Sequence, residues 1–129
     1  MRRLQLERLV NDYKWLAKEN DCAVIMASQL NRSIESRGGG AKRPQLSDLA
    51  ESGAIEQVAE NVFFVYYPYK VDRATHSANE IYLVASKVRY GETGEIMLGY
   101  NGSVCTIYDD VLDLTNPGEK NDTRTLPFD

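Results

Sequence analysis

Three small groups of side chains have types and spacing suited to contacts with phosphate. Gln29 lies two residues after the apolar run Ala23–Ala27, and a basic, glycine-rich stretch covers residues 31–44. Farther along the chain, one residue separates Lys87 from Arg89. An amide can donate hydrogen bonds to an anion, and a cation can pair with one.

The stretch 31–44 is basic although the 129-residue chain has a formal net charge of −4. It contains one carboxylate, that of Glu35, and four cations, which are Arg32, Arg37, Lys42 and Arg43. Gly38–Gly40 predict a mobile loop whose backbone can approach phosphates closely. Any contact with nucleic acid must come from a local patch of this kind, because the chain as a whole is acidic. The alternative is a solvated surface loop with incidental charge.

Other candidate sites fail on residue type or spacing. His76 is the only histidine and lies in a polar stretch, so we expect it to be solvent-exposed. Cys22 and Cys105 are far apart and outside metal-ligand spacing, which predicts two reduced, structural thiols. Ser28 has no matched histidine and acid and is not a credible nucleophile.

The first half of the chain predicts helices around one buried strand. Apolar residues recur at intervals of three and four over residues 3–18, which predicts an amphipathic helix. Ala23–Ala27 is apolar on both faces and predicts a strand in the middle of a sheet. Ser47 is a suitable N-cap for a second helix over about residues 48–61, which Gly53 interrupts.

The second half predicts strands. β-branched and aromatic residues indicate strands at Val62–Tyr67 and Glu80–Ser86. Asn101-Gly102 predicts a two-residue turn between strands at 95–100 and 103–108. Residues 110–129 are acidic and punctuated by Pro and Gly, which predicts a disordered tail. The expected class is α/β, with a central sheet flanked by helices and a C-terminal β-hairpin.

Length and hydropathy limit the broad class of protein. A chain of 129 residues is one domain or part of one. No window approaches the roughly 18 continuous apolar residues of a membrane helix, and the N-terminal residues lack the apolar core of a signal peptide. We therefore expect a cytoplasmic protein that has no membrane partner.

Four pieces of the sequence together resemble the DnaB-type replicative helicases, whose motor domain has a RecA-like fold. They are SQLNR at 28–32, Arg43-Pro44 leading into Ser47-Asp48-Leu49, ESGAIEQ at 51–57, and KVRYG at 87–91. The order and spacing of these pieces extend the resemblance over about residues 3–109. It implies that residues 1–109 are the C-terminal portion of a RecA-like helicase ATPase domain, and that Ala23–Ala27 is a central strand of a partial RecA-like fold.

The resemblance implies catalytic roles for three residues. Gln29 matches a glutamine at a strand end that senses the γ-phosphate of the nucleotide. Lys87 and Arg89 match paired basic residues that reach the neighbouring subunit's ATP site, where the arginine acts as a finger. From the residues alone, a strand-end amide bonded to the backbone is the favoured interpretation of Gln29, and two solvated charges are the common case for a KxR pair; the surrounding motifs reverse both preferences.

The resemblance also implies contacts with single-stranded DNA in the channel of a hexameric, homo-oligomeric ring. The basic loop that carries Arg32, Arg37, Lys42 and Arg43 would face this channel. A second DNA-facing turn matches Glu51, Ser52 and Gly53. Ala50 stands where family members commonly have an arginine, which removes one phosphate contact from that turn.

A motor of this kind needs a GxxxxGK[ST] loop and a strand-end acid for Mg²⁺, and the sequence contains neither. Gly38–Lys42 resembles this loop only superficially, because it lacks the second glycine before the lysine and a following Ser or Thr. We therefore expect ATP and Mg²⁺ to be cofactors of the complete motor and not to be bound by this chain alone, which we expect to be inactive by itself.

Three hypotheses follow for the function. The first is a portion of a hexameric replicative helicase that couples ATP hydrolysis to translocation on single-stranded DNA and duplex unwinding. The second is a non-catalytic interaction or regulatory module that assembles with intact helicase subunits. The third is a different protein with a RecA-like fold, such as a strand-exchange or clock-type ATPase. The KxR pair and the ESGxIEQ segment make this third hypothesis less favoured than the first.

Overall fold

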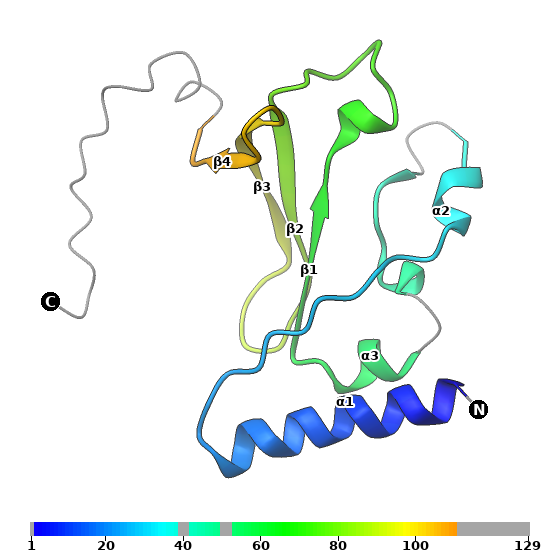
Figure 1. Cartoon of the computed structure of the whole chain (residues 1–129), viewed down its shortest axis with the longest axis vertical. Helices are drawn as coiled ribbons and strands as arrows, with labels where there is room; N and C mark the ends of the chain where they lie inside the picture. The colour runs from blue at the N-terminus through cyan, green and yellow to red at the C-terminus, as the bar shows by residue number, and fades with distance from the viewer. Residues whose placement is uncertain (1, 39–41, 50–52, 111–129) are drawn as a thin grey trace, which may run out of the picture.

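The computed structural model describes residues 2–38, 42–49 and 53–110 of the chain (Figure 1). The first part contains helices α1 (Arg2–Glu19) and α2 (Ser33–Ser36), the 3₁₀ helix η2 (Leu46–Asp48) and helix α3 (Gly53–Val58). The second part contains the strands β1 (Asn61–Tyr66), β2 (Glu80–Val88), β3 (Gly94–Asn101) and β4 (Thr106–Tyr108), with the 3₁₀ helix η3 (Pro68–Lys70) after β1. The α/β class predicted from the sequence is confirmed.

The four strands form one antiparallel sheet in the order β1-β2-β3-β4. Tyr66 pairs with Tyr82 across β1 and β2, and Tyr82 pairs in turn with Met97 on β3. A register shift between Val62 and Phe63 marks an irregularity near the start of β1. The two predicted strands at 62–67 and 80–86 are therefore confirmed, with β2 extending farther toward Lys87 than the sequence pattern indicated.

The C-terminal hairpin is also confirmed, but its predicted two-residue turn is wrong. Turn residues occupy positions 102–105, and β4 begins only at Thr106. The side-chain oxygen of Asn101 accepts hydrogen bonds from the backbone N–H and the hydroxyl of Ser103, at 3.1 and 2.6 Å. Such a side-chain turn competes with the tighter backbone turn. Cys105 has a φ of 49°, which closes the longer loop.

The predicted N-terminal helix is confirmed as α1, which runs along one end of the molecule (Figure 1). Its Val10 is buried in a cluster with Leu49, Ile55, Val62 and Phe64, so α1, α3 and β1 share one small core. This core lies at the end of the sheet where β1 begins and β2 ends. No helix in the described part of the chain is long and apolar enough to cross a membrane.

The prediction of a buried central strand at Ala23–Ala27 is wrong for this structure. The whole segment is exposed, with Ile25 97% accessible, and it belongs to no strand. An extended segment becomes a strand only when a neighbour completes its hydrogen bonds, and the sheet begins at β1 without it. A hollow of about 820 Å³ lies among α1, this segment and β1.

The predicted continuous helix over about 48–61 is also wrong. The described residues there form the short η2 and then α3, which begins at Gly53 instead of being bent by it. Gln45, not Ser47, caps the 3₁₀ turn through a reciprocal pair of bonds with Asp48. Leu49 leaves helical geometry, with ψ at 120°, and pairs with Leu30 in an isolated bridge. That tertiary pairing takes precedence over the local helical pattern.

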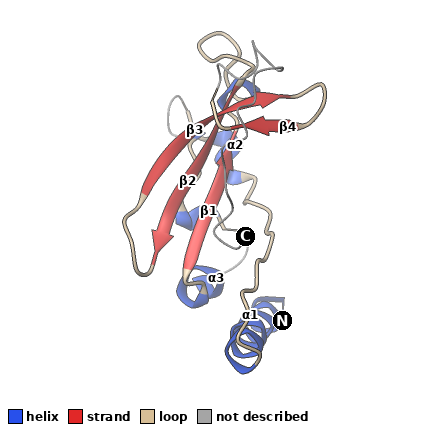
Figure 2. Ribbon diagram, turned by 90° about the vertical axis from the view of Figure 1, so that its left-hand side faces the viewer, coloured by secondary structure: helices blue, strands red, loops and turns tan. Residues whose placement is uncertain are grey.

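The described part of the loop predicted over 31–44 includes the short helix α2. The predicted disordered tail falls outside the described residues except for Asp110. On the sheet face opposite the core, Phe63, Val65 and Ile96 are more than half exposed, at 55%, 62% and 58%. Figure 2 looks onto the sheet from a side on which no helix crosses β2 or β3.

Candidate functional site

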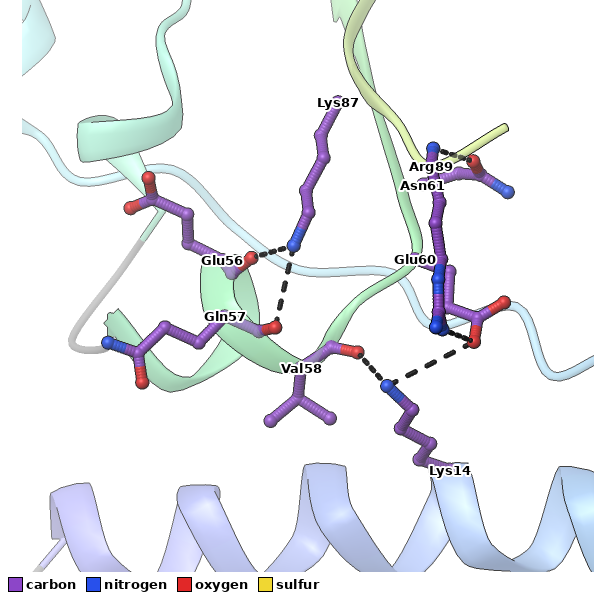
Figure 3. A network of polar contacts seen from close by, with 8 residues as sticks. All are labelled: Lys14, Glu56, Gln57, Val58, Glu60, Asn61, Lys87 and Arg89. Carbon is purple, nitrogen blue, oxygen red and sulfur yellow. Dashed lines mark hydrogen bonds and ion pairs between the residues drawn. The ribbon is translucent and has the colours of Figure 1, made fainter. Parts of the chain in front are cut away.

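Lys87, near the end of β2, reaches the C-terminal end of α3 (Figure 3). Its ammonium donates hydrogen bonds to the carbonyl oxygens of Glu56 at 2.5 Å and Gln57 at 3.4 Å. Carbonyls in the last turn of a helix have no partner inside the helix, and they form the negative end of its dipole. Lys87 therefore caps α3 within its own chain in this arrangement.

Arg89 is anchored at both its backbone and its side chain. Its N–H donates to the carbonyl of Glu60 at 3.1 Å and to the side-chain oxygen of Asn61 at 3.2 Å. Its Nη1 donates to Oε1 of Glu60 at 2.6 Å, and its guanidinium lies 5.2 Å from the centre of the Tyr90 ring. The side chain remains 48% exposed. A guanidinium has five N–H donors, so most of them remain for an anion.

Glu60 also approaches a second cation, on α1. Lys14 Nζ lies 4.0 Å from the same Oε1 of Glu60 and donates to the carbonyl of Val58 at 3.2 Å. Lys14, Glu60 and Arg89 thus join α1, the end of α3 and the end of β2 (Figure 3). The structure brings the predicted pair Lys87 and Arg89 to this one junction, and sequence reasoning missed both Lys14 and Glu60.

Gln29 is exposed and follows the irregular segment that was expected to be a strand. Its own carbonyl accepts a hydrogen bond from the Ser28 hydroxyl at 3.3 Å. The next residue, Leu30, is fixed by its bridge to Leu49, so the chain is anchored directly after Gln29. The side chain of Gln29 is therefore open to solvent beside a fixed point of the fold.

The predicted DNA loop is tied to the body of the protein at several points. Asn31 N–H donates to the carbonyl of Asp48 at 2.7 Å, beside the Leu30–Leu49 bridge. The guanidinium of Arg37 pairs with the carboxylate of Asp48, whose side chain is only 5% exposed. The other oxygen of Asp48 accepts a hydrogen bond from the N–H of Gln45 at 2.7 Å.

Arg43 is held over the sheet. Its Nη1 lies 2.6 Å from Oε2 of Glu95, and its guanidinium lies 5.6 Å from the ring centres of both Tyr66 and Tyr82. Neither Arg32 nor Lys42 forms an ion pair with another residue in the described ranges. Arg37 and Arg43 therefore stabilise the loop, whereas the charges of Arg32 and Lys42 have no ion-pair partner among the described residues.

The second predicted DNA-facing turn is only partly visible. Glu51 and Ser52 lie outside the described residues. Gly53 begins α3, and a side chain there would meet no atom of the described residues within 4 Å.

The remaining candidates lie away from this site. His76, expected to be exposed, is half-buried. Asp72 accepts hydrogen bonds from the hydroxyl of Thr75 at 2.7 Å and from the N–H of Ala74 at 3.0 Å, and these bonds lower the pKa of its carboxyl. Both cysteines are free thiols. Within residues 2–38, 42–49 and 53–110, no three His, Cys, Asp or Glu side chains gather in a way that could hold a metal ion.

Comparison with known proteins decides the family. Residues 1–109 match the family described as the DnaB-like helicase C-terminal domain. The chain belongs to this family. The DnaB-like assignment confirms the resemblance found in the sequence, and it identifies the α/β fold as part of a DnaB-like ATPase domain.

Curated DnaB-like relatives are similar over most of the chain. It is 38% identical over 101 residues to the replicative DNA helicase DnaB of Haemophilus influenzae, a match that covers 78% of this chain and 21% of the relative. It is 36% identical over 99 residues to the replicative DNA helicase DnaC of Bacillus subtilis, covering 77% and 21% of the two chains. The chain thus spans about a fifth of the length of these relatives.

Two solved DnaB-like structures match in fold. The ATPase domain of G40P superposes with a TM-score of 0.79 at 35% identity, over 84% of this chain and 38% of that domain. A DnaB-like replicative helicase, described with its interactions with primase, gives a TM-score of 0.74 at 37% identity, over 79% and 24% of the two chains. The sheet and the helices around the candidate site therefore correspond to one part of a larger DnaB-like ATPase domain.

Proposed function

We propose that this chain serves as the C-terminal part of the ATPase domain of a hexameric replicative helicase. The complete motor would couple ATP hydrolysis to movement along single-stranded DNA and to unwinding of the duplex. The observation that carries this proposal is the family match over residues 1–109, which contains all four sequence pieces in order. The incomplete core supports it, because a hollow and an exposed sheet face remain for the rest of such a domain.

Arg89 is the proposed finger that acts on a nucleotide held by the neighbouring subunit. Its side chain is 48% exposed and retains N–H donors beyond the one given to Glu60. A finger that acts in trans needs a neighbour, which supports a closed homo-oligomeric ring. Lys87 is proposed as its partner at the same site, but its ammonium must first leave the carbonyls of Glu56 and Gln57.

Gln29 is the proposed sensor of the γ-phosphate. Its side chain is exposed, and the chain directly after it is anchored by the bridge between Leu30 and Leu49. An amide in this position could bind phosphate on one side and transmit its presence to Leu49 and the start of the DNA loop on the other. Hydrolysis would then be coupled to that loop through a short run of backbone.

Arg32 and Lys42 are the proposed phosphate contacts to single-stranded DNA, because neither is paired with another described residue. Arg37 and Arg43 are proposed to shape the loop through Asp48 and Glu95, and to add long-range attraction. The turn at Glu51, Ser52 and Gly53 is proposed as a second, weaker contact to the DNA backbone, since Ala50 supplies no charge there.

ATP with Mg²⁺ would supply the phosphoryl group for this chemistry. The GxxxxGK[ST] loop that cradles its phosphates is not among the 129 residues, so this chain would contribute only Gln29 to the site in its own subunit and Lys87 with Arg89 to the adjacent one. The proposed roles are therefore phosphate sensing and charge stabilisation.

The direct test is ATP turnover by a ring motor assembled from subunits that carry this segment. Arg89→Ala should reduce kcat by about 10³-fold or more, the value associated with an arginine finger. Arg73→Ala is the matched control, because Arg73 is exposed in the loop after β1 and stacks 5.7 Å from the Tyr69 ring. Equal turnover of the two variants would show that Arg89 is not the finger.

The second candidate is a non-catalytic module that assembles with intact helicase subunits. The sequence favours it in one respect, since these residues include the proposed trans-acting pair but no GxxxxGK[ST] loop. Adding the chain to an intact DnaB-type motor would distinguish the two. Incorporation into the ring with a change in ATP turnover supports the module, and the absence of any association supports the first candidate.

A further inference from the structure

We propose that Glu60 is a positioning residue for Arg89, and that Lys14 keeps this arrangement cationic. The inference rests on the proposed function of Arg89 as a trans-acting finger. Glu60 lies between the end of α3 and the start of β1, and no sequence piece shared with the helicases pointed to it. Its carboxylate contacts the Arg89 guanidinium (Figure 3). Its backbone carbonyl accepts a hydrogen bond from the Arg89 N–H.

The geometry fixes Arg89 at two separate points. The Glu60 carbonyl and the Asn61 side chain hold its N–H at 3.1 and 3.2 Å, which sets where its side chain starts. The Glu60 carboxylate holds Nη1 at 2.6 Å, which sets where its side chain ends. A long side chain held at both ends loses little further rotational freedom when it meets phosphate, so its remaining donors are preorganised for the neighbouring site.

A carboxylate that holds a finger also neutralises it, and Lys14 offsets this effect. The ammonium of Lys14 lies 4.0 Å from the oxygen that binds Arg89. The three formal charges of Lys14, Glu60 and Arg89 sum to +1, so the cluster still attracts an anion. The bond from Lys14 to the Val58 carbonyl, at 3.2 Å, also keeps this ammonium beside Glu60.

The alternative role for Glu60 is structural, as one half of an ordinary surface ion pair. Glu60 and Arg89 are 44% and 48% exposed, and pairs this exposed add little to folding stability. A variant of Glu60 should therefore stay folded and lose only the order of the Arg89 side chain. Glu56, on the nearby helix α3, provides a matched control, because its carboxylate points away from Lys87 and only its backbone carbonyl accepts a bond there (Figure 3).

The first experiment measures the order of the Arg89 side chain by ¹⁵N relaxation of its Nε–H group in the 129-residue chain. We expect an ordered group in the unchanged chain and in Glu56→Ala, increased motion in Glu60→Ala, and partial recovery in Glu60→Asp, which keeps the charge. Equal order in the Glu60→Ala chain and the unchanged chain would overturn the positioning role, whatever the motor does.

The second experiment measures kcat and KM for ATP in the assembled motor. Glu60→Ala should lower kcat by about 10- to 100-fold, the usual cost of a misplaced catalytic group, while KM stays unchanged. It should have no further effect in an Arg89→Ala background, because its action passes through Arg89. Losses that multiply in the double variant would overturn the inference for Glu60 alone. Full activity of Arg89→Ala would instead overturn the finger itself, and the positioning role in catalysis with it.

Discussion

Removal of the Asp48 carboxylate should loosen the attachment of the DNA loop and destabilise the fold. Asp48 is 5% exposed and has two partners, the Arg37 guanidinium and the Gln45 N–H at 2.7 Å. In Asp48→Ala, Arg37 loses its ion pair and Gln45 loses the acceptor of its reciprocal cap. The chain leading from the loop into η2 would then lose both of its contacts with the Asp48 carboxylate and keep those that Arg43 makes with Glu95 and the sheet.

The magnitude follows from the unequal exposure of the two partners. Breaking a fully buried ion pair costs about 3–5 kcal/mol, because the remaining charge stays desolvated. Arg37 is 26% exposed and can turn toward water, which reduces this part of the cost. Loss of the capping bond from Gln45 adds about 1 kcal/mol. We expect Asp48→Ala to lower the free energy of unfolding by about 3 kcal/mol. Arg37→Ala should lower it by about 3–4 kcal/mol, because that variant leaves the buried Asp48 carboxylate without its cation.

Urea denaturation followed by far-ultraviolet circular dichroism measures both values, with Arg32→Ala as the control because Arg32 has no ion pair to another described residue. In the double variant of Arg37 and Asp48 the losses should be less than additive, because both act through one pair. A loss below about 1 kcal/mol in Asp48→Ala, with an unchanged m-value, would refute the argument that this carboxylate holds the loop.

Three further predictions concern the proposed contacts. Replacing Arg32 and Lys42 together by Ala should weaken the binding of single-stranded DNA. The slope of log K against log salt concentration should become shallower by about 0.7 per lost contact, whereas Arg43→Ala should leave this slope nearly unchanged. Equal slopes for the two variants would contradict the division of the loop cations into DNA contacts and structural residues. Gln29→Ala should abolish the stimulation of ATP turnover by DNA, and retained stimulation would remove the sensor role. Lys87→Met should lower the free energy of unfolding by about 1 kcal/mol, because the carbonyls at the end of α3 lose a charged donor. An unchanged urea midpoint would contradict the capping of α3 by Lys87.

The sequence predicted those elements whose pattern is local. The three- and four-residue spacing of apolar side chains identified α1, and the β-branched and aromatic runs identified β1 and β2. The same logic placed a buried strand at Ala23–Ala27, where the structure has an exposed segment. Composition reports that a segment is suited to burial, but it carries no information on whether a neighbouring strand is present within the same chain.

The sequence predicted the cations of the candidate site but not the residues that pair with them. The motif pieces pointed to Lys87 and Arg89, and the structure places both at one junction. Glu60 lies 29 residues from Arg89 in the sequence and Glu95 is 52 residues beyond Arg43, so only the folded sheet brings each pair together. Ser47 looked like a helix cap by residue type, yet Gln45 performs this role because its side chain and that of Asp48 bond each other's backbone.

The sheet has a further consequence for the order in which the chain folds. Its strands pair only with their neighbours in sequence, β1 with β2, β2 with β3, and β3 with β4. Contacts between sequence neighbours close short loops and form quickly. The hairpins should therefore assemble first and provide the surface on which α3 and α1 dock. The segment at Ala23–Ala27 belongs to no strand of this sheet and would be ordered after the hairpins.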